Sequence, residues 1–130
     1  MERKNFLIDT NIAIYYFGLL LSESSESFLD LLIRKSYCIS VINRIELLGF
    51  SKLDRNQYSV LETFVANATI LELDEPVVVE TIKIRRYNNI KLPDAIIAAT
   101  CIVNNCCLVT NNRRDFEKIE GLMIETMKLA

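Results

Sequence analysis

Five short apolar runs alternate along the chain with longer segments whose apolar residues recur at helical spacing. The runs have the length of buried strands and cover residues 6–8, 37–42, 69–73, 107–110 and 122–125. The helical patterns cover residues 11–21, 25–35, 43–50, 54–67, 75–88 and 93–104. Because parallel neighbouring strands need a crossover element between them, this alternation predicts a three-layer α/β/α fold. Helices then cover both faces of a mainly parallel central sheet of four to five strands.

The composition favours one domain and removes several kinds of chemistry. No linker, low-complexity tract or repeat interrupts the 130 residues, so we expect a single domain over residues 1–130. The chain contains no histidine, which excludes every mechanism that needs an imidazole base. Acid chemistry must therefore come from carboxylates. The formal net charge of −2 gives no simple electrostatic argument for or against nucleic acid.

The cysteines and the apolar runs indicate the cellular compartment of the protein. The spacing of the cysteines matches neither a metal-binding pair nor a disulfide framework, so we expect them to be reduced and buried. The first residues reach an acid too soon for a secretory signal, and the apolar run 12–21 is too short to span a bilayer. We therefore expect a cytoplasmic protein with no membrane partner. The four cysteines are Cys38, Cys101, Cys106 and Cys107.

Four acidic residues lie where the predicted strands end. Asp9 directly follows the run 6–8, and Glu46 lies one helical turn past the run 37–42. Asp115 lies five residues past Thr110, and Asp94 opens the helix that leads into the run 107–110. In an open parallel sheet the carboxyl ends of the strands share one edge, where ligands bind. We therefore expect the four acids to converge.

Each acid taken singly also has a structural explanation. Asp9 suits the cap of the first helix, and Asn43 with Glu46 fits a capping-box spacing. Asp94 follows a proline and suits the first turn of a helix, where the macrodipole favours negative charge. Asp115 fits a solvated helix residue. The apolar context of each acid and the shared predicted edge favour a joint site.

Several carboxylates within a few ångström raise one another's pKa, and a divalent cation resolves this conflict. With oxygen ligands alone and no histidine, the preferred ion is Mg²⁺, for which Mn²⁺ can substitute. Such an ion polarises a phosphoryl oxygen and lowers the pKa of a bound water. The acid cluster therefore points to phosphodiester hydrolysis.

Four segments resemble the four motifs of PIN-domain proteins, in the same order and at the same spacing. The segments are LIDTNI at residues 7–12, SVINRIELLG at 40–49, LPDAIIAA at 92–99 and LVTNNRRDF at 108–116. They are most similar to the VapC toxins of toxin–antitoxin pairs. The resemblance covers nearly the whole chain and implies a ribonuclease that cleaves single-stranded RNA with water, leaving a 3′-hydroxyl and a 5′-phosphate.

The resemblance also implies roles for individual residues. Asp9 and Asp94 correspond to the principal Mg²⁺ ligands, and Glu46 and Asp115 complete the acidic site. The polar residues beside these acids are expected to support the first ligand or to orient the phosphate; they are Thr10, Asn11, Thr110 and Asn112. Relatives often carry an acidic residue near Asn112, where this chain has asparagine.

Basic residues flank two of the acids and are candidates for RNA contacts. Without the four site carboxylates the remaining formal charge is positive, so the acidic total does not oppose RNA binding. Solvated helix faces are an equally good explanation of the same residues. The candidates are Arg85, Arg86 and Lys91 before Asp94, and Arg113, Arg114 and Lys118 on either side of Asp115.

The first helix is apolar nearly all round, which exceeds what one packed face needs. Ile12 and Tyr16 are expected in the core, and the remaining apolar surface, residues 15–21, is a candidate interaction patch. In VapC-like proteins a cognate antitoxin binds beside the active site and toxins pair into homodimers. The resemblance therefore implies both partners here, with this surface as the candidate.

Two other functions fit parts of the sequence. One is phosphoryl transfer through Asp9 as a nucleophile, but Thr10 and Asn11 follow it where a second aspartate is expected, and no partner lysine follows a late strand. The other is a catalytically silent PIN-like module that binds RNA or protein. The presence of all four acids disfavours such a decayed site.

Overall fold

The computed structural model describes residues 5–130 and contains one sheet in which all pairings between strands are parallel. The order of the strands is β3-β2-β1-β4-β5, so the first strand of the chain lies at the centre. The strands are β1 (Asn5–Ile8), β2 (Cys38–Ser40), β3 (Thr69–Leu71), β4 (Cys106–Thr110) and β5 (Met123–Thr126). This confirms the predicted α/β class.

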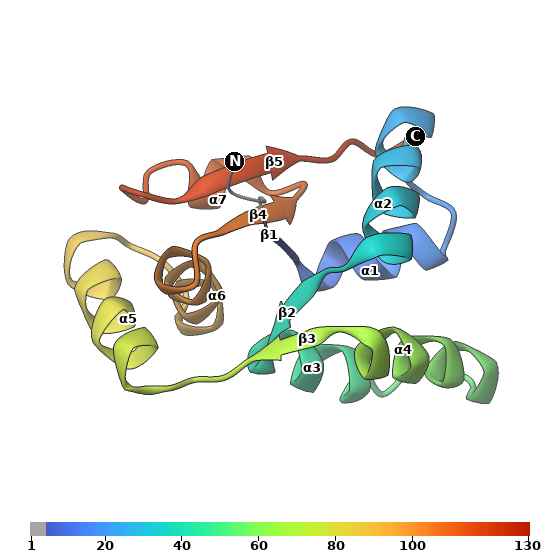
Figure 1. The fold of residues 1–130 in the computed structure, drawn as a ribbon, viewed down its shortest axis with the longest axis horizontal. Helices are drawn as coiled ribbons and strands as arrows, with labels where there is room; N and C mark the ends of the chain where they lie inside the picture. The colour runs from blue at the N-terminus through green and yellow to red at the C-terminus, as the bar shows by residue number, and fades with distance from the viewer. Residues whose placement is uncertain (1–4) are drawn as a thin grey trace.

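Helices connect successive strands, as parallel pairing requires. Figure 1 shows α5 and α6 packed beside each other at one end of the sheet, with α1 to α4 towards the other end. The helices are α1 (Thr10–Phe17), α2 (Glu23–Lys35), α3 (Val41–Leu48), α4 (Arg55–Asn67), α5 (Glu75–Tyr87), α6 (Leu92–Val103) and α7 (Arg113–Phe116).

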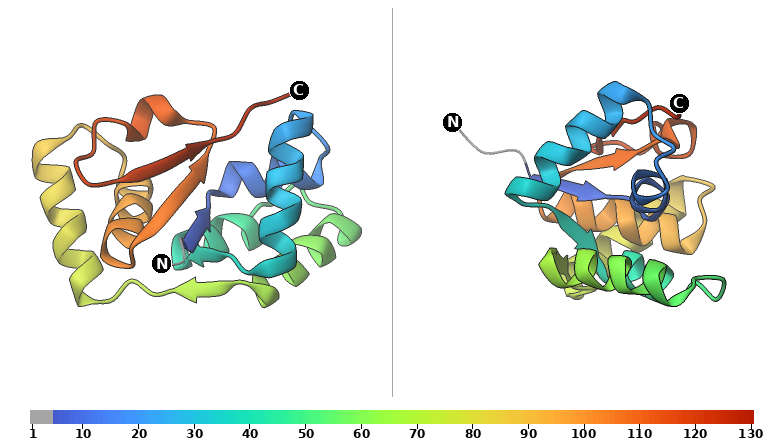
Figure 2. Two further views of the ribbon diagram at one scale, coloured as in Figure 1. Left: turned by 45° about the horizontal axis from the view of Figure 1, so that its top comes forward. Right: turned by 90° about the vertical axis from the view of Figure 1, so that its right-hand side faces the viewer.

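Two apolar cores, one on each face of the sheet, make the three layers. Successive strand residues point to opposite faces, so Leu7 and Leu108 enter one core while Ile8 and Val109 enter the other. The first core is closed by α5, α6 and α7, and the second by α1, α2 and α4. In the right-hand view of Figure 2, α2 lies on one side of β1 and β4 and α6 lies on the other. Both faces are buried, which explains the nearly continuous apolar runs of the central strands.

Several element boundaries differ from the predicted ones. The first helix ends at Phe17 instead of residue 21, because Leu19 adopts a left-handed conformation (φ 58°) and the chain turns away. The amide groups of Leu19 and Leu20 donate to the carbonyl groups of Tyr16 and Tyr15, a Schellman arrangement. The strand 37–42 is shortened to β2, since Ser40 caps α3.

The remaining expectations concern single residues and membrane spans. Ile12 is fully buried, whereas Tyr16 is half-buried and packs against the same core. Cys101, Cys106 and Cys107 are buried and Cys38 is half-buried; none of the four forms a disulfide. Within residues 5–130, the helices are too short or too polar to cross a membrane.

Candidate active site

Asp9 lies at the carboxyl edge of the sheet, where β1 passes directly into α1. The register between β1 and β4 pairs Ile8 with Val109, which brings Asp9 beside Thr110. The Thr110 hydroxyl donates to Asp9 Oδ2 at 2.9 Å, and the Thr10 amide donates to Asp9 Oδ1 at 2.9 Å. Asp9 thus caps α1, as expected from its position before the first helix, and it also lies at the edge of the sheet where ligands bind.

Glu46 reaches the same edge from α3. The Thr10 hydroxyl donates to Glu46 Oε1 at 2.7 Å and accepts from Asn43 Nδ2 at 3.0 Å. The capping explanation for Glu46 is wrong, because the capping box of α3 joins Ser40 to Asn43, three residues earlier. Asn43 is fully buried and fixes the hydroxyl of Thr10. The sequence alone does not single out this role, because Ser40–Asn43 and Asn43–Glu46 both have the spacing of a capping box.

Asp94 and Asp115 approach from the other side of the edge. Asp94 lies in the first turn of α6, which leads into β4 and therefore begins at the carboxyl edge. Asp115 is exposed on α7, where it accepts a hydrogen bond from Asn112 Nδ2 at 2.7 Å. The backbone N–H of Asn112 donates to the Thr110 hydroxyl at 3.0 Å. Asp94 and Asp115 line one cavity of about 420 Å³.

The pKa shifts link the four acids electrostatically. Burial, followed by the charges of Asp94 and Glu46, raises the pKa of Asp9 to about 6, although hydrogen bonds from Thr110 and Thr10 oppose the rise. Burial is also the largest cause of the raised pKa of Asp94, and the charges of Asp115 and Glu46 raise this pKa further. Asp94 therefore lies within electrostatic reach of the other three acids, and the structure brings all four to one edge.

The oxygen atoms at this edge fit Mg²⁺ by their chemistry. Among residues 5–130, no group of three or more acidic or cysteine side chains is arranged to hold a metal ion. Mg²⁺ is typically held by one or two carboxylates and keeps several waters, so a pair of ligands suffices. Each Asp9 oxygen accepts one hydrogen bond and retains a lone pair. Asp9 and the half-buried Asp94 would therefore hold the ion.

The predicted RNA contacts and supporting residues divide into two groups. Lys91 and Arg114 line the cavity of Asp94 and Asp115, together with Lys118. Arg113 does not line this cavity, and it pairs with Glu117 at 3.6 Å. The structure leaves the other predicted residues outside this cavity: Arg85 and Arg86 line a neighbouring hollow beside Leu92, and Asn11 is exposed with no side-chain hydrogen bond within residues 5–130.

The fold and the site together define a class of protein: a parallel α/β domain with four carboxylates at the carboxyl edge of its sheet. Residues 6–122 match the family model described as "PIN domain". The chain belongs to the PIN-domain family.

Relatives match the chain over most of its length. It is 30% identical over 128 residues to the tRNA(fMet)-specific endonuclease VapC of Shigella flexneri, covering 92% of this chain and 96% of the relative. It is 31% identical over 129 residues to the protein of that name from Salmonella typhimurium, with the same coverage. Among solved structures it resembles VapBC2 from Rickettsia felis bound to a promoter DNA fragment (TM-score 0.77, 27% identity, 93% and 97% covered). DNA-bound VapBC from Salmonella typhimurium is also similar (TM-score 0.78, 26% identity, 95% and 98% covered).

Proposed function

We propose that this protein is a Mg²⁺-dependent endoribonuclease that cleaves single-stranded RNA and acts as the toxin of a VapBC-type toxin–antitoxin pair. The observation that carries the proposal is that Asp94 lies within electrostatic reach of three other carboxylates at the carboxyl edge, those of Asp9, Glu46 and Asp115. The VapC relatives support it, because they are named as endonucleases that act on a transfer RNA.

The residues at the edge divide the chemistry among them. Asp9 and Asp94 would hold the ion, and a bound Mg²⁺ would supply Lewis-acid chemistry to a phosphodiester and lower the pKa of a bound water. Glu46 is exposed and its Oε1 accepts from Thr10, so Oε2 is free to take the proton from the attacking water. Thr110 fixes Asp9, while Asn112 holds Asp115 beside Asp94.

The test compares RNA cleavage by the wild type and by Asp94→Asn, purified identically, with Mg²⁺, Mn²⁺ or EDTA. Glu62→Gln is the matched control, because this exposed carboxylate on α4 lies outside the site. We expect cleavage by the wild type and the control with either ion, loss in EDTA, and loss of at least about 100-fold in Asp94→Asn. Equal cleavage by wild type and Asp94→Asn, or no cleavage of any RNA pool by the wild type, would overturn the proposal.

The antitoxin partner is proposed to dock on the end of the first helix. Leu19 and Leu20 are 77% and 52% exposed, and a small apolar cavity of about 230 Å³ lies between this turn and α4. The VapBC complexes among the structural neighbours support such a partner. Leu20→Ser should weaken binding of the antitoxin encoded beside this gene in a pull-down, whereas Leu31→Ser on α2, equally exposed at 55%, should not.

We propose that the protein also forms a homodimer in solution and works in the cytoplasm. The free cysteines support a reducing compartment. Sedimentation equilibrium of the isolated protein tests the dimer: a single species of 15.0 kDa at all concentrations would exclude it.

A further inference from the structure

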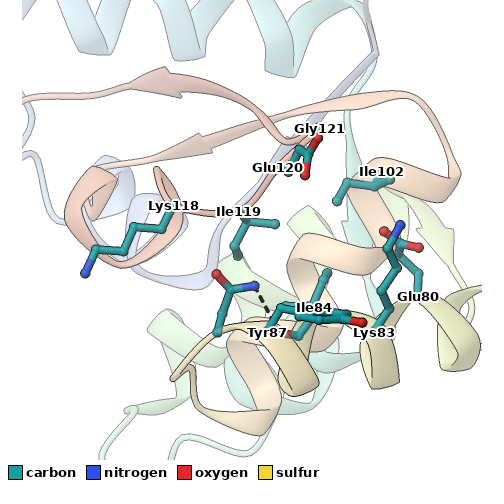
Figure 3. A pocket seen from close by; sticks show the side chains of 10 residues that line it. Glu80, Lys83, Ile84, Tyr87, Ile102, Lys118, Ile119, Glu120 and Gly121 are labelled. Atoms are coloured by element: carbon teal, nitrogen blue, oxygen red, sulfur yellow. Dashed lines mark hydrogen bonds between the residues drawn. The ribbon is translucent and has the colours of Figure 1, made fainter.

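A second and larger cavity lies next to the acid site. It has a volume of about 730 Å³ and opens between α5 and the segment that follows α7. In Figure 3, Lys118 lies at one end of the cavity, and Lys83 and Glu80 lie at the other. Lys118 also lines the cavity of Asp94 and Asp115, so the two hollows adjoin. A volume of about 300–1,000 Å³ is typical of cavities that bind small ligands.

The most exposed aromatic ring of the described residues stands at this cavity. Tyr87 ends α5 and is 75% exposed, whereas the other well-exposed tyrosine, Tyr58, is only 39% exposed. The guanidinium carbon of Arg86 lies over the Tyr87 ring at 5.9 Å from its centroid. A cation therefore lies over one face of the ring, and three quarters of the Tyr87 surface remains accessible to a planar partner. Proteins bind single-stranded nucleic acid by stacking bases on such rings.

The charges around the cavity suit a nucleotide as a whole. Within residues 5–130 the ion pair is Arg113 with Glu117, so neither Lys83 nor Lys118 is neutralised by a close carboxylate. Glu80 and Glu120 also line the cavity, so it is not a purely cationic phosphate site. Carboxylates accept hydrogen bonds from the amino groups of bases and from the 2′-hydroxyl of RNA. The mixed lining therefore fits a base and a ribose, with a phosphate at the Lys118 end.

We infer that this cavity is a subsite for a nucleotide of the RNA strand that flanks the cleaved phosphodiester. Tyr87 stacks on the base, and Lys118 binds the phosphate that links this nucleotide to the acid site. The inference rests on the proposed ribonuclease function. It adds a binding subsite on α5 and on the segment after α7, away from the four carboxylates.

The binding test uses a mixed-sequence single-stranded RNA oligonucleotide carrying fluorescein, followed by fluorescence anisotropy. All proteins carry Asp94→Asn, which prevents cleavage during the titration. Tyr87→Ala should weaken binding about tenfold or more, because stacking of one base contributes that much. Tyr87→Phe keeps the ring and should bind as before, and Tyr58→Ala is the matched control on α4. Lys118→Gln should weaken binding and reduce the salt dependence by about one phosphate contact.

The kinetic test uses the same substitutions in the active protein. Tyr87→Ala should lower kcat/KM through a higher KM, because the lost contact is made equally in the bound substrate and the transition state. On irradiation, RNA that contains 4-thiouridine should become crosslinked to the tryptic peptide that contains Tyr87.

Three results would overturn the subsite. The first is that Tyr87→Ala binds and cleaves RNA as well as the wild type does. The second is that Tyr87→Phe and Tyr87→Ala lose the same amount of RNA affinity. The third is that Tyr87→Ala changes the oligomeric state of the protein. The last result would make this surface a contact between copies of the chain. An absence of metal-dependent cleavage by the wild type would instead overturn the ribonuclease function, so the two failures are distinguishable.

Discussion

The substitution Asp9→Asn should stabilise the protein when no divalent ion is present. Asp9 is only 8% exposed, and its burial with the charges of Asp94 and Glu46 raises its pKa from 3.8 to about 6. The folded state therefore binds a proton more tightly than the unfolded state between these two values. Wild-type stability is unaffected by this group below about pH 4 and falls as the pH rises through about 6.

The size of the effect follows from the shift. One pKa unit corresponds to about 1.4 kcal/mol, so a rise from 3.8 to about 6 lowers the free energy of unfolding by about 3 kcal/mol above pH 7. Asparagine removes this cost but leaves the Thr110 hydroxyl without its acceptor, which costs about 1 kcal/mol. The expected net gain is therefore about 2 kcal/mol at neutral pH. It should shrink as the pH falls and become a loss of up to about 1 kcal/mol below about pH 4, where only the lost hydrogen bond remains.

Urea unfolding in EDTA at several pH values measures this difference. Asp54→Asn is the matched control, because Asp54 caps α4 and asparagine caps equally well, so its effect should be small at every pH. Saturating Mg²⁺ should reverse the order by stabilising the wild type alone. A variant Asp9→Asn that is less stable than the wild type in EDTA at neutral pH, or a difference independent of pH, would refute the reasoning.

Two further substitutions test other parts of the fold. Thr10→Val leaves the buried amide of Asn43 without an acceptor, so we expect a loss of about 1–3 kcal/mol in urea unfolding and slower RNA cleavage. Unchanged stability would show that this hydrogen bond is unimportant. Leu19→Gly relieves the left-handed conformation (φ 58°) and should stabilise the protein by about 1 kcal/mol in thermal unfolding. A lower melting temperature would contradict the strain.

The convergence of the acids is predictable because Asp9, Glu46 and Asp115 follow strand ends that are visible as the ends of apolar runs, and Asp94 opens the helix that leads into β4. Strand ends at one edge then bring Asp9 and Glu46 together across the intervening residues. The choice between two capping frames in α3 was not predictable, since both Ser40–Asn43 and Asn43–Glu46 have the required spacing. The contact of Thr10 with Glu46 decides between them, and it exists only in the folded sheet.

The existence of α7 and the end of the first helix could not be predicted from the sequence. The four-residue helix α7 is too short to show a hydrophobic period. The sequence predicts that the first helix continues to residue 21, because Leu19, Leu20 and Leu21 extend its apolar pattern beyond Gly18. Only Leu21 is buried, where it forms a bridge with Leu129, and the other two leucines are exposed.

Two features of this fold cost free energy locally, the raised pKa of Asp9 and the left-handed Leu19. Such costs persist where another gain offsets them, and they cluster at functional sites. Asp9 is a proposed ion ligand, and Leu19 lies on the surface proposed for the antitoxin. Both surfaces begin on α1, whose first turn holds Thr10 and whose last turn leads to Leu19. A partner that binds the end of this helix therefore lies one short helix away from the carboxylates, near enough to restrict access of RNA to them.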